Sequence, residues 1–371
     1  MRKEKREMNK EQSNLRFRAK SKNIFLWINQ YFGFILIPAI AIIILIILIF
    51  IFSDNPFSTL YFFFIGPFRS VFSFGNMLNA SVPLILGALG VSIAMKTGNL
   101  NLGGEGQVYL GAFITVAAAL ELSNTFLSQY GIIIIIIACL LGTLCSGSIA
   151  ALSGFCKAKW NTNELITTFL LSCAVIPVIN YLITGPYLNP ETSLISTKKI
   201  AENLRLALLL KPSNLNIGIF IAIFFVFIVH IFLSKTKLGY EFRMAGKNEI
   251  FARYGGINTK LNTVMAMLFS GILYGLAGSI AVLGTHHAVI KEFSSGLGWN
   301  ALAVALIARF YSPAVIPAAF FFAWLGAGSR IAMQNTGLTM DVALIVQAVI
   351  LFLCTSTVLL KAFLKTGKHD G

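Results

Sequence analysis

The chain has 371 residues, of which 57% are hydrophobic and only 12% are charged, and its formal net charge at pH 7 is +15. So few charged side chains cannot cover a soluble protein that has this many apolar residues, which excludes the soluble globular class. The positive charge does not indicate a nucleic-acid partner, because the basic residues lie at the ends of apolar segments, where they set membrane topology. The composition therefore predicts a polytopic protein whose surroundings are the lipid bilayer.

Ten apolar segments follow one another along the chain, and a membrane-spanning helix needs about 20 such residues. The segments lie roughly at residues 32–52, 77–95, 106–122, 130–155, 165–184, 217–233, 261–283, 297–310, 314–329 and 343–360. The eighth and ninth are short and are separated by Pro313, so they could instead form a helical hairpin that does not cross fully. The expected fold class is all-α, with about ten transmembrane helices.

Basic stretches fall on one side of the membrane if the chain crosses it ten times. They are the two tails, residues 156–160 and residues 234–260. Because cytoplasmic loops carry an excess of Lys and Arg, we expect the N- and C-termini to be cytoplasmic. The expected organisation is a basic tail at 1–31, a transmembrane domain at 32–360 and a second tail at 361–371.

The expected outer loop at 185–216 is long for a connection between two spans. Its stretch near 198–210 could form a short surface helix. The loop either touches a partner or is a solvated connector.

The cytoplasmic loop at 234–260 contains the pattern of a short helix. Asn248 can cap its N-terminus, and Glu249 suits the positive end of the helix dipole. Gly255 and Gly256 can end it. A docking site and an ordinary solvated helix are the two interpretations.

Two glycine-interrupted polar stretches occur in the apolar part, one in each half. Residues 97–107 hold two asparagines, a glutamate and a glutamine, and the second stretch covers 284–300. Irregular backbone at membrane depth occurs only where it faces protein or a wet cavity, and paired interruptions point to a central substrate site. A plain cytoplasmic turn is the alternative for 97–107.

Motifs of catalytic and metal chemistry do not occur in the sequence. There is no GxxxxGK[ST] nucleotide-binding loop, no CxxC and no HExxH. His286 and His287 are adjacent, so they do not share a helix face as a metal pair does. We expect no catalytic residue, no metal and no cofactor bound by this chain, so that energy for uphill transport comes from another chain.

Four stretches resemble the permeases of ABC importers in the branched-chain amino acid and ribose-type family, closest to the nucleoside and simple-sugar subgroup. The sequence N-L-G-G-E-G-Q at 101–107 looks like the glycine–asparagine–glutamate signature of that family. Residues 163–168, 239–257 and 296–313 are similar to its segment after the fourth span, its coupling loop and its late glycine-rich segment. The resemblance runs from about residue 77 to residue 355.

The resemblance implies a non-catalytic permease subunit, multi-pass in the bacterial cytoplasmic (inner) membrane. It implies two ATP-binding subunits that hydrolyse ATP, an extracytoplasmic substrate-binding lipoprotein, and a second permease, more readily a paralogue than an identical copy. Nucleosides are the expected substrates, and riboflavin or a simple sugar such as ribose or galactose are the alternatives. A more remote alternative is an ion-coupled secondary transporter, which would need intramembrane ionisable residues that are scarce here.

The resemblance also implies site residues by position. The coupling helix and its ATPase-docking surface would include Glu241, Arg243, Gly246, Asn248, Phe251, Ala252, Arg253, Tyr254 and Gly256. The substrate pathway would pass Asn99, Asn101, Glu105, Gln107, Trp299 and Asn300. The chain departs from the family pattern at Glu249, where proline is usual, at Phe251, where alanine is usual, and at Asn300, where aspartate is usual.

Overall fold

A computed structural model describes residues 38–294, 296–337, 344–345, 348–349 and 352. Within these residues the fold is helical, and the only extended pairings are two isolated bridges, Ser196 to Ile290 and Leu208 to Asn216. The all-α class expected from the sequence is confirmed.

Seven helices in the described part of the chain are long and apolar enough to cross a membrane. They are α3 (Val71–Lys96), α4 (Gly104–Ser123), α5 (Gly131–Trp160), α6 (Glu164–Thr184), α7 (Gly218–Lys235), α10 (Thr259–Ala281) with the π-helical turn that extends it to His286, and α12 (Val315–Thr336). Shorter helices are Pro38–Phe52, α2 (Pro56–Phe64), α8 (Lys237–Lys247), α9 (Glu249–Tyr254) and α11 (Leu297–Ile307).

The expected bundle of about ten spans is therefore found in part. The predicted ninth span, 314–329, lies within the candidate span Ser312–Thr336, which includes α12 and is full length. The predicted eighth, 297–310, contains the 11-residue α11, which is too short to cross. The first, 32–52, begins outside the described residues, and most of the tenth, 343–360, also lies outside them. The expected surface helix near 198–210 is wrong, because that stretch contains only the 3-10 turn Glu202–Leu204.

Side-chain caps set where several helices begin, since the first backbone N–H groups of a helix have no partner inside it. Ser70 accepts from the backbone of Ser73 at the start of α3, and Asn258 accepts from Leu261 at the start of α10. At the other end of α5, Asn161 takes the left-handed conformation, which stops the helix.

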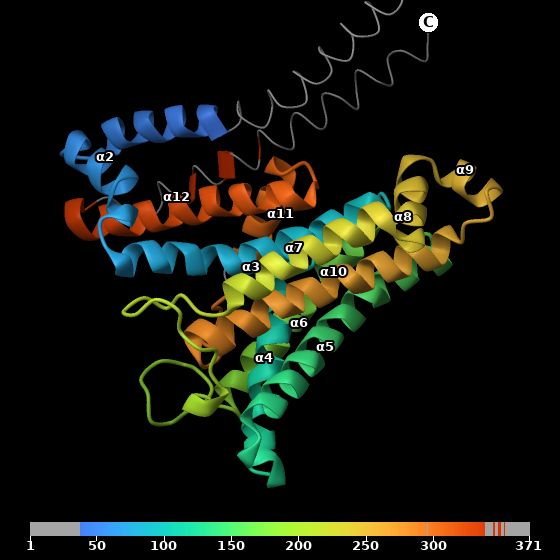
Figure 1. The fold of residues 1–371 in the computed structure, drawn as a ribbon, viewed down its shortest axis with the longest axis horizontal. Helices are drawn as coiled ribbons and strands as arrows, with labels where there is room; N and C mark the ends of the chain where they lie inside the picture. The colour runs from blue at the N-terminus through green and yellow to red at the C-terminus, as the bar shows by residue number, and fades with distance from the viewer. Residues whose placement is uncertain (1–37, 295, 338–343, 346–347, 350–351, 353–371) are drawn as a thin grey trace, which may run out of the picture.

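The centre of the bundle is built from α3 and α10, which bury more of their length than the other membrane helices (Figure 1). Small residues allow this close approach, as is usual where membrane helices meet. A Cβ at Gly111 of α4 would lie 2.5 Å from the Cα of Gly275 on α10, and one at Gly271 would lie 2.6 Å from the carbonyl oxygen of Ser146 on α5. The helices can therefore pack this closely only because these positions carry no side chain.

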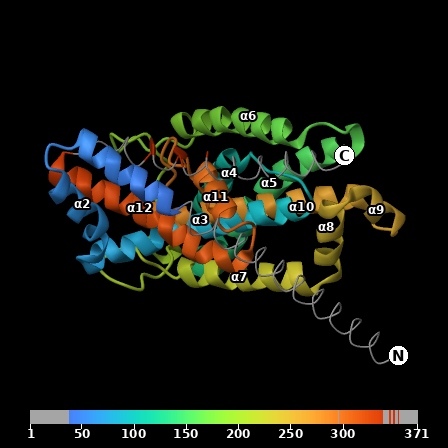
Figure 2. The ribbon, with the colours of Figure 1, turned by 90° about the horizontal axis from the view of Figure 1, so that it is seen from above.

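The bundle has two distinct ends (Figures 1 and 2). Helices α8 and α9 project at one end, beyond the last turn of α7 and the first turn of α10, and we call this the α9 end. The segment 185–216 lies at the other, which we call the loop end.

Candidate functional site

The centre of the bundle holds a buried polar network built on Asn101. Its Nδ2 donates to Gln107 Oε1 at 2.8 Å and to Ser270 Oγ at 3.0 Å, while its Oδ1 accepts from Gln107 Nε2 and from the Gly103 backbone, each at 3.0 Å. Ser270 is at the midpoint of α10, so the chain between α3 and α4 re-enters the bundle to about half its depth. The alternative of a plain surface turn at 97–107 is wrong, because this stretch is largely buried.

The second interrupted segment meets the first at Glu105, in the first turn of α4. Glu105 Oε2 accepts from the backbone N–H of Gly298 at 2.8 Å, at the start of α11. A Cβ at Gly298 would lie 2.7 Å from the Gly104 carbonyl carbon, so the two helix starts touch directly. One carboxylate thus lies where two helix N-termini converge, which their dipoles favour.

Between these helix starts the structure is nearly closed. The cavity between them has a volume of about 10 Å³ and is lined among others by Asn101, Glu105, Tyr274 and Trp299. Such a volume is at the lower limit for one water molecule. The centre is therefore a constriction rather than a binding chamber.

A larger cavity of about 470 Å³ opens on the loop-end side of this constriction. We call it the vestibule. Its lining comes from the first half of α3, the end of α10, the returning segment after α10, α12 and the loop 185–216. It comprises the polar residues Asn76, Asn79, Asn214, Thr285, His286 and Arg330, and the apolar residues Ala80, Val82, Pro83, Ile280, Ala281, Phe293 and Leu297.

Hydrogen bonds fix the amides of the vestibule. Asn79 Nδ2 donates to Thr285 Oγ1 at 2.8 Å, and its Oδ1 accepts from Asn216 Nδ2 at 2.9 Å. Asn76 Oδ1 accepts from the backbone of Asn214 at 2.9 Å, which orients its Nδ2 as a donor. These contacts join α3 to the loop and to the end of α10.

A second large cavity, of about 490 Å³, lies at the α9 end, and its charged lining is mostly basic. The basic residues are Lys157, Lys159, Lys247, Arg253 and Lys260. Asn99 also lines it, and its Nδ2 donates to Thr97 Oγ1 at 2.6 Å.

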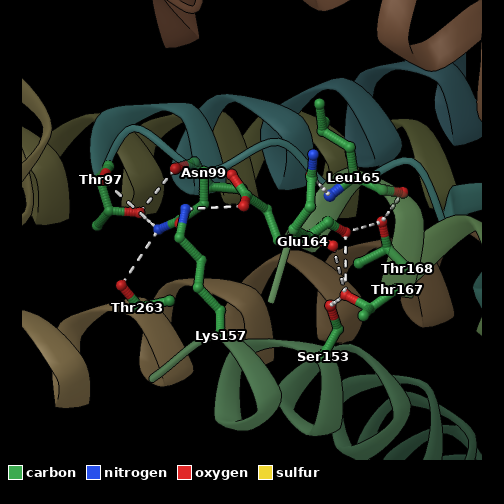
Figure 3. A network of polar contacts seen from close by, with 11 residues as sticks. Thr97, Asn99, Ser153, Lys157, Glu164, Leu165, Thr167, Thr168 and Thr263 are labelled. Carbon is green, nitrogen blue, oxygen red and sulfur yellow. Dashed lines mark hydrogen bonds and ion pairs between the residues drawn. The ribbon is translucent and has the colours of Figure 1, made fainter. Parts of the chain in front are cut away.

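Figure 3 shows the polar contacts beside this basic cavity, where the ends of α5 and α6 and the turn after α3 come together. Lys157 Nζ lies 2.8 Å from Glu164 Oε2, and both side chains are largely buried. Ser153 and Thr167 share a hydrogen bond at 2.6 Å, and Thr168 Oγ1 donates to the Glu164 carbonyl at 2.7 Å. The contacts fix α6 against α5 one turn from its start.

The short helix expected in the loop 234–260 is confirmed as α9. Asn248 accepts from the Phe251 backbone at 2.9 Å as its N-cap, and Gly256 follows it with φ of +77°. Gly246 packs so closely on the carbonyl oxygen of Lys96 that no side chain fits there. Helix α9 is thus capped at its start, and the end of α8 just before it packs against the end of α3.

Two faces of α9 differ in exposure. Ala252 is buried. Arg253 Nε donates to Thr259 Oγ1 at 3.0 Å, and its Nη2 donates to Glu249 Oε1 at 2.5 Å. In contrast, Phe251 and Tyr254 are 61% and 89% exposed. One face therefore fixes α9 to the start of α10, and the other is open.

The structure brings together most of the predicted pathway residues, but not all of them. Asn101, Glu105, Gln107 and Trp299 meet at the constriction, whereas Asn99 lies apart at the α9 end. Asn300 lines none of the cavities described above.

The predicted coupling residues Glu241 and Arg243 lie on α8, which leads from α7 to α9. Glu241 is 4.0 Å from Lys237 and accepts from Asn262 Nδ2 at 3.4 Å, so it braces α8 against α10.

The vestibule residues outside the interrupted stretch 284–300 were missed by sequence reasoning. Asn76 and Asn79 fall three residues apart at the start of an apolar span, and Arg330 is a lone cation near the end of another. A polar or charged residue inside a span is the signal that could have found them.

A bundle of membrane helices with two polar chain reversals meeting at its centre is the architecture of a multi-pass transport protein. Residues 73–355 match the model of the family described as branched-chain amino acid transport system / permease component, and the chain belongs to this family. Its members are subunits of ABC transporters, which implies ATP-binding subunits and a substrate-binding protein as partners.

Curated relatives cover most of the chain. It is 35% identical over 309 residues to a probable riboflavin import permease protein of Treponema pallidum, covering 82% of this chain and 80% of the relative. It is 28% identical over 347 residues to a nucleoside ABC transporter permease protein of Lactococcus lactis, covering 90% and 94%. It is 29% identical over 304 residues to a glucose ABC transporter permease protein of Haloferax volcanii, covering 79% of each chain. No solved structure matches the chain.

Proposed function

We propose that this chain is the permease subunit of an ATP-driven importer in the bacterial inner membrane, and that the importer takes up nucleosides. The observation that carries the proposal is α9, which is fixed to the bundle on one face and presents Phe251 and Tyr254 on the other. An exposed aromatic pair on a fixed support is suited to a protein partner. The partner of α9 is an ATP-binding subunit.

Charge supports a cytoplasmic α9 end. Five Lys and Arg side chains line its cavity, against one carboxylate, Glu249. An excess of basic residues is typical of the cytoplasmic side. The vestibule then faces outward, where an extracytoplasmic binding protein delivers the substrate.

Alternating access is the mechanism that fits the cavities. The vestibule and the basic cavity lie on opposite sides of the closed constriction at Asn101 and Glu105. ATP binding moves α9 and α8, and α8 passes the motion to α10 through Glu241 and Asn262. Because Asn101 is bonded to Ser270 of α10, the constriction responds when α10 moves.

We take the candidate substrates from the transport functions of the similar permeases. A nucleoside and riboflavin both consist of a planar nitrogen heterocycle bearing a five-carbon polyhydroxyl group. Riboflavin is therefore the second candidate, favoured by the Treponema relative at 35% identity. A glucose-type sugar is the third.

The proposed assembly contains two ATP-binding subunits and two permeases, with no cofactor bound by this chain. The membrane faces of α5 and α6 carry exposed large apolar side chains such as Ile132, Leu144 and Leu170. These faces meet lipid or the second permease, a paralogue in our proposal.

Uptake of radiolabelled guanosine tests the proposal. Cells that lack this chain should lose uptake, and the wild-type chain should restore it. The double variant Phe251→Gly/Arg253→Gly should not restore it and should not co-purify with the ATP-binding subunit. The matched control is Phe126→Gly, which removes an 85% exposed phenylalanine at the loop end and should restore uptake. Full uptake by the α9 variant, with the ATP-binding subunit still attached, would refute the docking assignment.

A further inference from the structure

We propose that the vestibule is a binding site for the planar heterocycle of the substrate, with Phe293 on the ring face and Arg330 and Asn76 on its polar edge. The inference rests on the proposed importer function and adds the part of the substrate that is recognised and the residues that recognise it. A volume of about 470 Å³ is suited to a small molecule, since such sites span about 300–1,000 Å³.

The lining of the vestibule combines apolar and polar side chains. Its apolar lining includes Val82 and Pro83 on α3 and Ile280 and Ala281 on α10. Its polar lining includes Arg330 on α12 and Asn76 at the outer part of α3. A flat heteroaromatic ring suits such a lining, because its faces are apolar and its edge carries nitrogen and oxygen atoms.

The polar residues Asn76 and Arg330 of the vestibule have side-chain donors that are available to a ligand. The Oδ1 of Asn76 is occupied by the Asn214 backbone, so its Nδ2 is left to donate. Arg330 forms no ion pair with a carboxylate among the described residues, and its guanidinium offers a planar set of donors. A guanidinium of this geometry can donate two parallel hydrogen bonds to adjacent acceptors on a heterocycle edge, as it does with guanine.

Aromatic side chains of the vestibule supply a stacking contact for the face of the heterocycle. The ring centroids of His286 and Phe293 lie 5.3 Å apart at an interplanar angle of 63°, and both residues line the vestibule. The ring centroids of Phe293 and Tyr109 lie 5.8 Å apart, and this contact helps to hold Phe293 in place. A supported aromatic face is a stacking platform that tolerates any flat base.

A simple sugar fits this lining poorly. Its hydroxyl groups point outward all around the ring, and each buried hydroxyl needs a partner. The apolar residues of the lining, such as Val82, Pro83 and Ile280, have no side-chain donor or acceptor to offer them. The vestibule therefore distinguishes nucleosides and flavins from hexoses by the ring, not by the polyhydroxyl group.

Direct binding tests the assignment without the contribution of the binding protein. The permeases and ATP-binding subunits would be purified together in nanodiscs, and binding of tritiated guanosine and of tritiated riboflavin would be measured. Ribose, glucose, guanosine and riboflavin would serve as unlabelled competitors. Phe293→Ala and Arg330→Gln should each weaken binding of the labelled heterocycle about tenfold, because stacking on an aromatic side chain is worth about that factor or more.

Conservative and distant variants complete the experiment. Phe293→Tyr should keep near wild-type affinity for the labelled heterocycle, since it keeps the aromatic ring. Phe126→Ala, at the loop end but outside the vestibule, should change nothing.

Two results would overturn the inference: no heterocycle binding by the wild-type complex, or equal competition by sugars with unchanged affinity in Phe293→Ala and Arg330→Gln. Either result leaves the importer function standing if the α9 variant still abolishes uptake. If the α9 variant transports normally while the vestibule variants lose binding, the importer coupling fails and the binding site stands.

Discussion

Replacing Asn101 by alanine should destabilise the centre of the bundle more than any surface asparagine does. Asn101 is only 1% exposed and takes part in four hydrogen bonds, two with Gln107 and one each with Ser270 and Gly103. The alanine variant removes all four and leaves both ends of the Gln107 amide without their partner.

The magnitude follows from these bonds. A side-chain hydrogen bond within a membrane protein contributes about 0.6 kcal/mol on average and at most about 1.7 kcal/mol. Four of them give a loss of about 2–4 kcal/mol in the free energy of unfolding, including the cost of a buried amide without partners. Asn101→Asp keeps the acceptor but loses the donor, and it adds a buried charge, so it should be no more stable than the alanine variant.

Reversible unfolding of the purified chain in mixed micelles measures this loss. Asn335→Ala is the matched control, because Asn335 is exposed and, within the described part of the chain, its side chain bonds only to the Ile331 carbonyl of its own helix. It should change the free energy of unfolding by less than about 0.5 kcal/mol. Equal stability of Asn101→Ala and Asn335→Ala would refute the central role of this network.

Three further variants test the packing, the ion pair and the cap. Gly111→Ala places a methyl group against the Gly275 backbone and should cost about 1–3 kcal/mol, measured by the same unfolding assay; an unchanged value would contradict the close contact of α4 and α10. Lys157→Met and Glu164→Gln should show a coupling energy of about 1 kcal/mol in a double-mutant cycle, and additive effects would mean that the 2.8 Å pair adds nothing. Asn248→Ala removes the N-cap of α9 and about 1 kcal/mol of its stability, so it should reduce uptake, whereas Asn248→Ser should restore it.

Local signals made the short helix α9 predictable from sequence. Asn248 and Gly256 act within a few residues of the segment they delimit, so their roles need no knowledge of the tertiary fold. The interruption at 97–107 was predictable for a similar reason, because four glycines and five polar side chains do not continue an apolar span.

The vestibule was not predictable, because it depends on contacts between distant parts of the chain. Asn79 bonds to Thr285, which is 206 residues away, and Asn216 donates to Asn79 from a third segment. The depth at which α11 begins was also out of reach of hydropathy, although the shortness of the segment was visible in the sequence. Leu297 begins that helix inside the bundle, and the backbone of Gly298 donates to Glu105 there. Hydropathy reports which residues avoid water but not the depth at which a helix starts.

The narrow space at the constriction bears on leakage through this chain. A volume of about 10 Å³ beside Tyr274 and Trp299 is at the lower limit for one water molecule. In the importer proposed above, this conformation would hinder the passage of water and ions through the centre of the permease. A tight centre of this kind would help a cell to keep both its membrane voltage and the solute that it has already accumulated.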